Sequence, residues 1–185
     1  ISVHNERAII LIKQALEKSP WQAALHNYLG VILQQEKRWE KALEAFQQVI
    51  SLKPHAAQGY YNIACVYRQM KQYDQALSYL QKTIELSPTF GLAYNDMGLI
   101  YKEQKQARLE LECYQKALDM GYCSAVLYYN LGNWFRAHKL YKESKEYYNK
   151  SIELDPFFAP SYNNLANTLR DQGYLSEALS YLSEA

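Results

Sequence analysis

A small residue returns at intervals of 34 residues along this chain, five times in succession. The five residues are Gly30, Ala64, Gly98, Gly132 and Ala166. A constant period of this length arises when one supersecondary structure is stacked on copies of itself. The chain is therefore expected to fold as an array that works through a long surface, rather than as a globule with one central site.

Large side chains keep the same register as the small residues. Four residues before each small residue lies a ring: His26, Tyr60, Tyr94, Tyr128 and Tyr162. Sixteen residues after it lies another large residue: Phe46, Leu80, Tyr114, Tyr148 and Leu182. Apolar residues recur at helical spacing in both halves of each repeat, which predicts two helices. Prolines at positions 54, 88 and 156 are expected to stop the second helix, because proline excludes the preceding residue from the α region.

This order of residues resembles the tetratricopeptide repeat, in which an aromatic residue, Leu-Gly, Tyr, Ala, Phe and Pro stand at fixed offsets in 34 residues. The resemblance covers the whole chain and implies an all-α fold, a right-handed α-solenoid of stacked antiparallel helix pairs. The helices are expected at about residues 1–14 and 17–30 of each repeat. Residues 1–22 are predicted to be the second helix of a partial repeat. Repeat one follows at residues 23–56, repeat two at 57–90, repeat three, which is divergent, at 91–124, and repeat four at 125–158. Repeat five, at residues 159–185, is truncated at its C-terminal end.

Repeat three departs from the pattern at three places. Glu110 stands where the other repeats have a small core residue, and Ala107 stands where three of them have an aromatic residue. Gly121 replaces the expected Asp or Ser before proline, and it is expected to end the helix through a left-handed cap. These exchanges are compatible with drift that neighbouring residues compensate, or with a bend between repeats three and four.

Composition argues against several classes of function. The net charge of +1 favours neither nucleic acid nor a membrane surface as partner. No apolar run approaches the ~20 residues that span a bilayer. Cys65, Cys113 and Cys123 form no paired motif, so we expect a reducing compartment and a cytoplasmic protein. Neither end carries a polar cap, which predicts a fragment of a larger protein.

The first helix of each repeat has two different faces. At 100° per residue, positions 4, 7, 8 and 11 of the repeat cluster on the core side, and positions 2, 6, 9 and 13 fall opposite. The family resemblance implies that this opposite side lines a concave ligand groove. The residues expected to contact a peptide there are Asn62, Asp96, Asn130, Asn164, Asn133 and Asn167, with Tyr61 and Tyr129 beside them.

Asparagine suits a peptide ligand because its amide has both a donor and an acceptor for a peptide group. Position 6 has Asn in three of the five repeats and Asp96 in a fourth. The row is similar to the asparagine ladders with which some tetratricopeptide grooves bind extended peptides. The alternative is that these amides serve helix packing.

A basic edge flanks this face at position 12. It consists of Arg68, Lys102, Arg136 and Arg170. These cations favour acidic partners by steering, but cations also suit the last turn of any helix. The heat-shock chaperone clamp of the family is not expected, because it needs Lys at position 5 and Lys or Arg at positions 2 and 6, and no repeat has them.

The sequence contains no recognisable catalytic, cofactor or metal motif, since its four histidines are scattered and no phosphate loop or nucleophile elbow occurs. Three functions are compatible with it. The first is a non-catalytic scaffold, without a cofactor, that binds an extended peptide of a protein partner. The second is the substrate-recognition region of a larger enzyme, for example a glycosyltransferase. The third is a structural array that self-associates through its uncapped ends.

Overall fold

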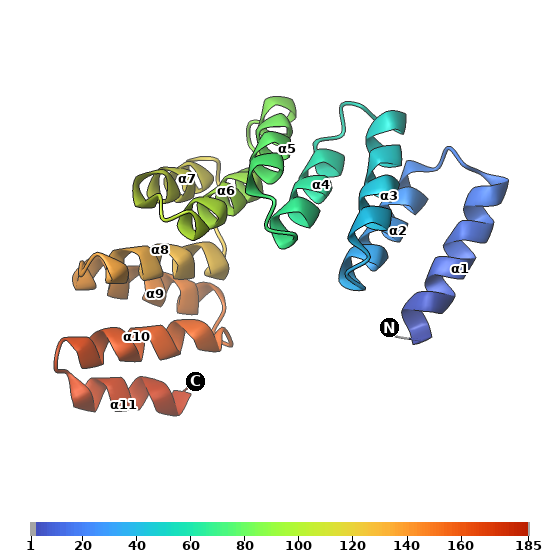
Figure 1. Cartoon of the computed structure of the whole chain (residues 1–185). Helices are drawn as coiled ribbons and strands as arrows, with labels where there is room; N and C mark the ends of the chain where they lie inside the picture. The colour runs from blue at the N-terminus through green and yellow to red at the C-terminus, as the bar shows by residue number, and fades with distance from the viewer. Residues whose placement is uncertain (1–2, 185) are drawn as a thin grey trace. The chain divides into compact units, whose positions relative to one another are not determined.

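The computed structural model describes residues 3–184, and these form eleven α-helices and no strand (Figure 1). The helices are α1 (Val3–Lys18), α2 (Ala23–Gln35), α3 (Trp39–Leu52), α4 (Ala57–Gln69), α5 (Tyr73–Leu86), α6 (Gly91–Glu103), α7 (Ala107–Asp119), α8 (Ala125–Ala137), α9 (Tyr141–Leu154), α10 (Ala159–Asp171) and α11 (Leu175–Glu184). The expected all-α solenoid class is confirmed. The chain divides into an N-terminal unit, Ile1–Ala93, and a C-terminal unit, Tyr94–Ala185.

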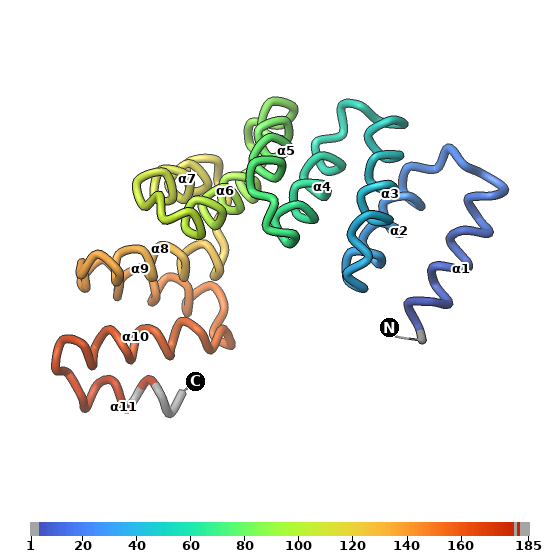
Figure 2. Tube along the Cα trace, in the orientation of Figure 1, coloured from blue at the N-terminus to red at the C-terminus, as the bar shows by residue number. Residues whose placement is uncertain are grey.

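The period of the sequence is visible in the helix boundaries. First helices begin at Ala23, Ala57, Gly91, Ala125 and Ala159, and each has 13 residues. Second helices follow after a short turn, as the tube in Figure 2 shows within each unit. Helices α3 and α9 end two residues before a proline, and the intervening Lys53 and Asp155 leave the helical region, with φ of −137° and −141°. This is the conformation that a following proline imposes.

The turn inside each repeat contains one residue in the left-handed region. Its φ is 57°, 59°, 59° and 60° at Lys37, Lys71, Lys105 and Lys139, and 87° at Gly173. In repeat two, the Lys71 N–H donates to the Arg68 carbonyl (3.0 Å) and the next N–H donates to the Tyr67 carbonyl (2.9 Å), which closes α4. Left-handed backbone costs a residue with a Cβ about 1–2 kcal/mol. Four repeats therefore place a strained lysine where the fifth has glycine.

The small residues of the first helices are matched to the size of the side chain they meet. A Cβ on Gly132 would lie 2.5 Å from the ring of Tyr148, far inside van der Waals contact. Repeat two combines Ala64 with the smaller Leu80 at the same two positions, and both are buried. The side chain of Leu182, which corresponds to Tyr148 in repeat five, lies outside the described residues.

Repeat three keeps the helix pair despite its irregular sequence. Gly121 has φ of 77°, and its N–H donates to the Leu118 carbonyl over 2.8 Å, so the left-handed cap is confirmed. Glu110 is only 7% exposed. Trp134 of repeat four donates from Nε1 to the Ala107 carbonyl (2.8 Å), so an aromatic residue of the next repeat contacts the start of α7. The bend between repeats three and four remains a prediction.

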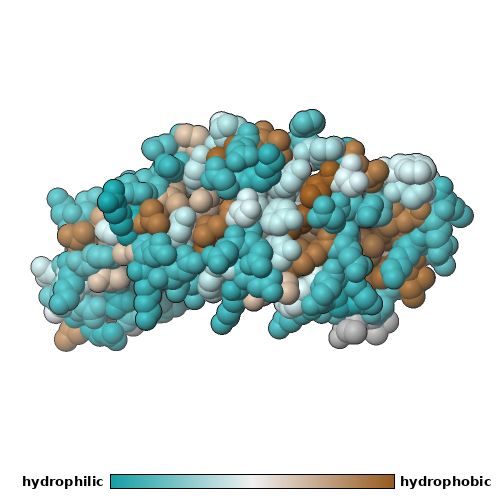
Figure 3. All heavy atoms as spheres, turned by 45° about the horizontal axis from the view of Figure 1, so that its top comes forward, coloured by the Kyte–Doolittle hydropathy of each residue, from teal (hydrophilic) through white to brown (hydrophobic). Residues whose placement is uncertain are grey.

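Polar side chains dominate the face drawn in Figure 3, with hydrophobic residues between them. Two large side chains are almost fully open to solvent, Trp21 at 79% and Phe157 at 95%. None of the helices among the described residues is long and apolar enough to cross a membrane.

Candidate peptide groove

Hydrogen bonds link the amide side chains of consecutive repeats on the face opposite the core. In the N-terminal unit, Asn62 Nδ2 donates to Asn27 Oδ1 over 2.7 Å. In the C-terminal unit, Asn130 Nδ2 donates to Asn95 Oδ1 over 3.2 Å. Both bonds join position 6 of one repeat to position 5 of the repeat before it, 35 residues away. This separation is one period plus one residue, so stacking of the repeats brings the two positions together. We call positions 5, 6 and 9 of the first helices the amide face.

Repeat five continues this pattern against repeat four. Asn164 Nδ2 donates to the Tyr129 hydroxyl (3.2 Å) and to Asn133 Oδ1 (2.6 Å). The Tyr148 hydroxyl donates to the same Asn133 oxygen over 2.8 Å. Within the part of the chain that the structure describes, Asn133 Nδ2 and Asn164 Oδ1 make no hydrogen bond. This amide pair therefore has one unused donor group and one unused acceptor.

Burial separates the predicted polar residues of positions 6 and 9 into two groups. The buried members are Asn62, Asp96 and Asn130, with exposures of 9%, 4% and 5%. The half-buried members are Asn133, Asn164 and Asn167. Buried polar side chains are usually satisfied by hydrogen bonds within the protein, and the buried asparagines use theirs to join neighbouring helices. Asn62 and Asn130 thus take part in packing between helices, and the half-buried amides lie in repeats four and five.

Aromatic rings lie beside the amides in both units. The centroid of the Tyr61 ring is 5.1 Å from that of Phe90, and the Tyr129 ring meets Phe158 edge-on at 5.5 Å. The two pairs are equivalent, because each joins position 5 of a repeat to position 34. Sequence reasoning selected both tyrosines and missed Phe90 and Phe158, although their 68-residue separation, twice the period, marks them as equivalent.

The basic edge is partly neutralised. Arg136 donates to Asp171 Oδ2 from Nε (3.2 Å) and from Nη2 (2.7 Å). Arg170 Nη2 lies 3.9 Å from the other oxygen of the same carboxylate. Lys102 is exposed and Arg68 is half-buried. Because Asp171 engages two of the four predicted cations, the edge attracts an acidic ligand less strongly than the sequence suggests.

The structure brings some of the predicted site residues together and places others apart. Asn133, Asn164 and Tyr129 form one hydrogen-bonded group. Asn167 instead lines a cleft of about 230 Å³ between α10 and α11, together with Arg170.

Metal-binding groups and cysteine thiols are the side chains that could support a reaction in these repeats. No group of three His, Cys, Asp or Glu side chains within the described range is placed to hold a metal ion. Burial raises the pKa of the Cys113 thiol to about 11, so this thiol is protonated at neutral pH and is a poor nucleophile. Cys65, at position 9 of repeat two, is half-buried.

Models of the tetratricopeptide repeat match the chain four times, at residues 21–89, 92–120, 125–158 and 147–180. Together the matches cover nearly the whole array of helix pairs. The chain belongs to the tetratricopeptide repeat family. Comparison with curated protein sequences finds no match.

Solved structures share this tetratricopeptide repeat fold at low sequence identity. PilF of Pseudomonas aeruginosa has a TM-score of 0.83 at 20% identity, over 96% of this chain and 81% of that one. MamA (residues 41 to end) from Desulfovibrio magneticus RS-1 has a TM-score of 0.72 at 18% identity, over 88% and 92%. YrrB, described as a protein of this family with an unusual peptide-binding site, has a TM-score of 0.66 at 20% identity, over 94% and 89%. At these identities the likeness concerns the fold.

Proposed function

We propose that this tetratricopeptide repeat array is a non-catalytic protein-interaction scaffold that binds an extended segment of a partner protein along its amide face. The observation that carries the proposal is the Asn133–Asn164 pair, in which an Nδ2 group and an Oδ1 atom are not hydrogen-bonded. Each residue of an extended peptide has one carbonyl acceptor and one N–H donor. The pair therefore suits a peptide backbone whatever its side chains.

Neighbouring side chains support the same proposal. Tyr129 and Phe158 form an aromatic pair beside the amides, and such rings add apolar contact area for a partner side chain. The peptide-binding site named for the similar fold of YrrB is in keeping with this assignment.

The test uses peptides selected from a random dodecapeptide library against the full chain, with dissociation constants measured by fluorescence polarisation. Asn133→Asp keeps an oxygen that accepts from Asn164 and Tyr148, but it replaces the unused Nδ2 donors by a second acceptor. We expect it to weaken peptide binding about tenfold, as the loss of one hydrogen bond does.

Asn149→Asp is the matched control for charge and residue type. Asn149 is exposed and lies on the second helix α9, outside the amide face of the first helices. We expect this variant to bind the selected peptides as the wild type does. Equal weakening by both variants would show an effect of charge alone, and unchanged binding by Asn133→Asp would remove the amide pair from the site.

Self-association is a second candidate function, because repeat five exposes a group of apolar side chains. Leu175 and Leu179 are 61% and 68% exposed and line the cleft between α10 and α11. Exposed apolar groups of this kind favour contact with another protein surface. Light scattering of the wild type and of Leu179→Glu over a hundredfold concentration range tests it. A dimer that the substitution abolishes supports self-association, and a monomer at every concentration rejects it.

A further inference from the structure

Repeats two and four place three neighbouring aromatic rings beside their second helix, from positions 4, 11 and 23. We call these positions the aromatic trio. In repeat two, the Tyr79 ring lies 6.4 Å from that of Tyr60 and 5.6 Å from that of Tyr67. In repeat four, the corresponding rings are those of Tyr128, Phe135 and Tyr147, where the last lies 6.2 Å and 5.1 Å from the other two.

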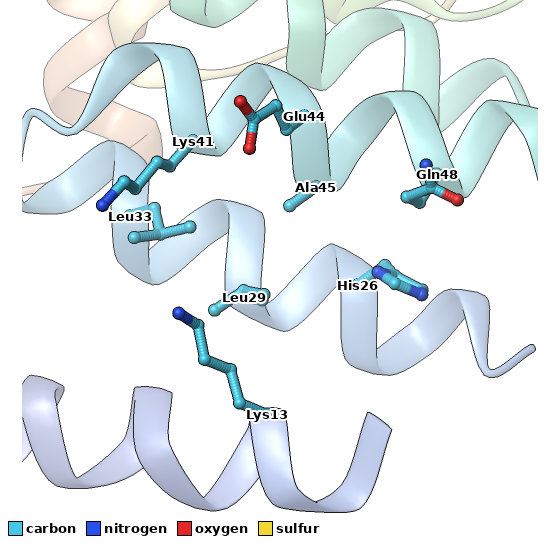
Figure 4. A pocket seen from close by; sticks show the side chains of 8 residues that line it. All are labelled: Lys13, His26, Leu29, Leu33, Lys41, Glu44, Ala45 and Gln48. Atoms are coloured by element: carbon cyan, nitrogen blue, oxygen red, sulfur yellow. The ribbon is translucent and has the colours of Figure 1, made fainter. Parts of the chain in front are cut away.

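Repeat one has no such ring cluster. Its trio positions hold His26, Leu33 and Ala45, so the tyrosine of position 23 is reduced to a methyl group. A cleft of about 470 Å³ opens at this place (Figure 4). Its volume falls within the range of about 300–1,000 Å³ that is usual for small-ligand sites. Repeat two, where Tyr79 occupies position 23, has a smaller cleft of about 340 Å³ beside the rings of Tyr60 and Tyr79. The larger cleft of repeat one reaches the trio positions on α2 and includes the place that an aromatic side chain takes in repeats two and four.

The lining of the cleft has an apolar floor and a charged rim. Leu29, Leu33 and Ala45 form the floor. The rim consists of Lys13 from α1, His26 from α2, and Lys41, Glu44 and Gln48 from α3. Figure 4 shows Lys13 reaching from α1 toward Leu29. Two ammonium groups against one carboxylate make the rim positive in sum.

We propose that this cleft binds an aromatic side chain of an acidic peptide segment, with tyrosine as the best fit. The ring would occupy the place that position 23 fills in repeats two and four. Carboxylates beside it would pair with Lys13 and Lys41 through charge-assisted hydrogen bonds. Glu44 and Gln48 offer acceptors for a phenolic hydroxyl.

This site is distinct from the amide face. Its residues on α2 stand at positions 4, 7 and 11, whereas the amide face uses positions 5, 6 and 9, on the other side of the helix. The proposal therefore goes beyond the function proposed above, and either can fail alone. Asn133→Asp, which tests the amide face, is expected to leave binding at the cleft unchanged.

The probe is the peptide acetyl-Asp-Asp-Tyr-Asp-Asp-amide, titrated into the full ¹⁵N-labelled chain and followed by NMR. We expect saturable shifts at residues of the cleft with a dissociation constant below about 1 mM, an affinity of the order of −4 kcal/mol. The same peptide with alanine at its centre should bind at least tenfold more weakly, because it lacks the ring. A version with four lysines around the tyrosine should also bind at least tenfold more weakly.

Variants of the chain complete the test. Ala45→Tyr rebuilds the aromatic trio, so we expect it to raise the melting temperature and to weaken peptide binding at least tenfold. Lys13→Gln with Lys41→Gln should weaken binding about fivefold, and Lys142→Gln, an exposed cation of repeat four, should not change it. Equal binding of the tyrosine and alanine peptides, or undiminished binding by a folded Ala45→Tyr variant, would overturn the proposal.

Discussion

Repeats three and four contain the same contact between a glycine and a tyrosine, Gly98 with Tyr114 and Gly132 with Tyr148. The two tyrosine hydroxyls differ in their hydrogen bonding. In repeat four, the Tyr148 hydroxyl donates to Asn133 at position 9. In repeat three, position 9 is Leu99, which has no acceptor, and the buried Tyr114 hydroxyl has no hydrogen-bond partner among the described residues. Burial raises the pKa of this hydroxyl, and the charge of Glu110, one helical turn before Tyr114, raises it further.

The small core position of the second helix differs in the same way. Ser144 of repeat four is fully buried, and its Oγ donates to the Gly132 carbonyl over 3.0 Å. At this position repeat three has Glu110, and burial raises the pKa of that carboxyl. The 34-residue period thus preserves the packing of a repeat. Whether the buried polar atoms of that repeat find hydrogen-bond partners depends on single residues.

The largest expected effect concerns what the two repeats share. Gly132→Leu and Gly98→Leu would each push a side chain into a tyrosine ring of the second helix. We expect each to destabilise its repeat by about 3 kcal/mol through overpacking. Hydrogen exchange measured by mass spectrometry should show lost protection in the affected repeat. Ala137→Leu, at the exposed end of α8, is the control and should preserve protection. A much milder effect of Gly98→Leu would show that the two cores are not equivalent.

The next largest effect is expected at Glu110, the buried carboxyl of repeat three at the position where repeat four has Ser144. Desolvation raises the pKa of Glu110, while the charges of Lys102 and, less strongly, His138 oppose this shift. A carboxyl with a raised pKa stabilises the fold below its unfolded pKa, and this contribution is lost as pH rises through the folded pKa. We therefore expect Glu110→Gln to be more stable than the wild type at pH 7, on the order of 1 kcal/mol, with a difference that closes toward pH 4.

Urea unfolding followed by circular dichroism at several pH values measures this difference. Glu103→Gln, at the exposed end of α6, is the matched control and should show no such pH-dependent gain. A loss of stability in Glu110→Gln at pH 7 would mean that the ionised carboxylate is favourable to repeat three.

The two tyrosine hydroxyls are expected to give effects of opposite sign. Tyr148→Phe removes a satisfied hydrogen bond and should cost about 1 kcal/mol. Tyr114→Phe removes a buried hydroxyl without a partner and should be neutral or stabilising by up to about 1 kcal/mol. Urea unfolding of the two variants under the same conditions checks the pair. Equal losses of stability would contradict the contrast between the repeats.

The helices can be predicted from sequence almost to the residue, and the amide contacts cannot. Five aligned copies fix where each helix begins, so the period alone identifies Ala125 and Ala159 as helix starts. The face that carries Asn130 follows from helical geometry alone. Whether its amide points to a ligand or to Asn95 depends on the stacking of repeats and on side-chain rotamers, which periodicity does not encode.

One signal in the sequence could have revealed these contacts. Side chains 35 residues apart form hydrogen bonds at two places along the first helices. Position 5 pairs with position 6 of the next repeat, as in Asn27 with Asn62 and Asn95 with Asn130. Position 12 pairs with position 13 of the next repeat, as in Gln34 with Gln69 (3.1 Å) and Arg136 with Asp171. Complementary residues at one period plus one position therefore indicate contacts between repeats. Because Asn130 joins α8 to α6 through such a contact, Asn130→Ala should lower stability.

The smallest effect concerns the turns, where repeats three and four are expected to behave alike. Lys105 and Lys139 have φ of 59° and 60°, and glycine adopts this conformation without a Cβ clash. Because glycine also loses more backbone entropy on folding, we expect Lys105→Gly and Lys139→Gly to gain only about 0.5 kcal/mol each. The reverse change, Gly173→Lys in repeat five, should lose a similar amount. Thermal unfolding of the three variants measures these differences. A gain confined to repeat four would show that the irregular residues of repeat three alter its turn as well as its core.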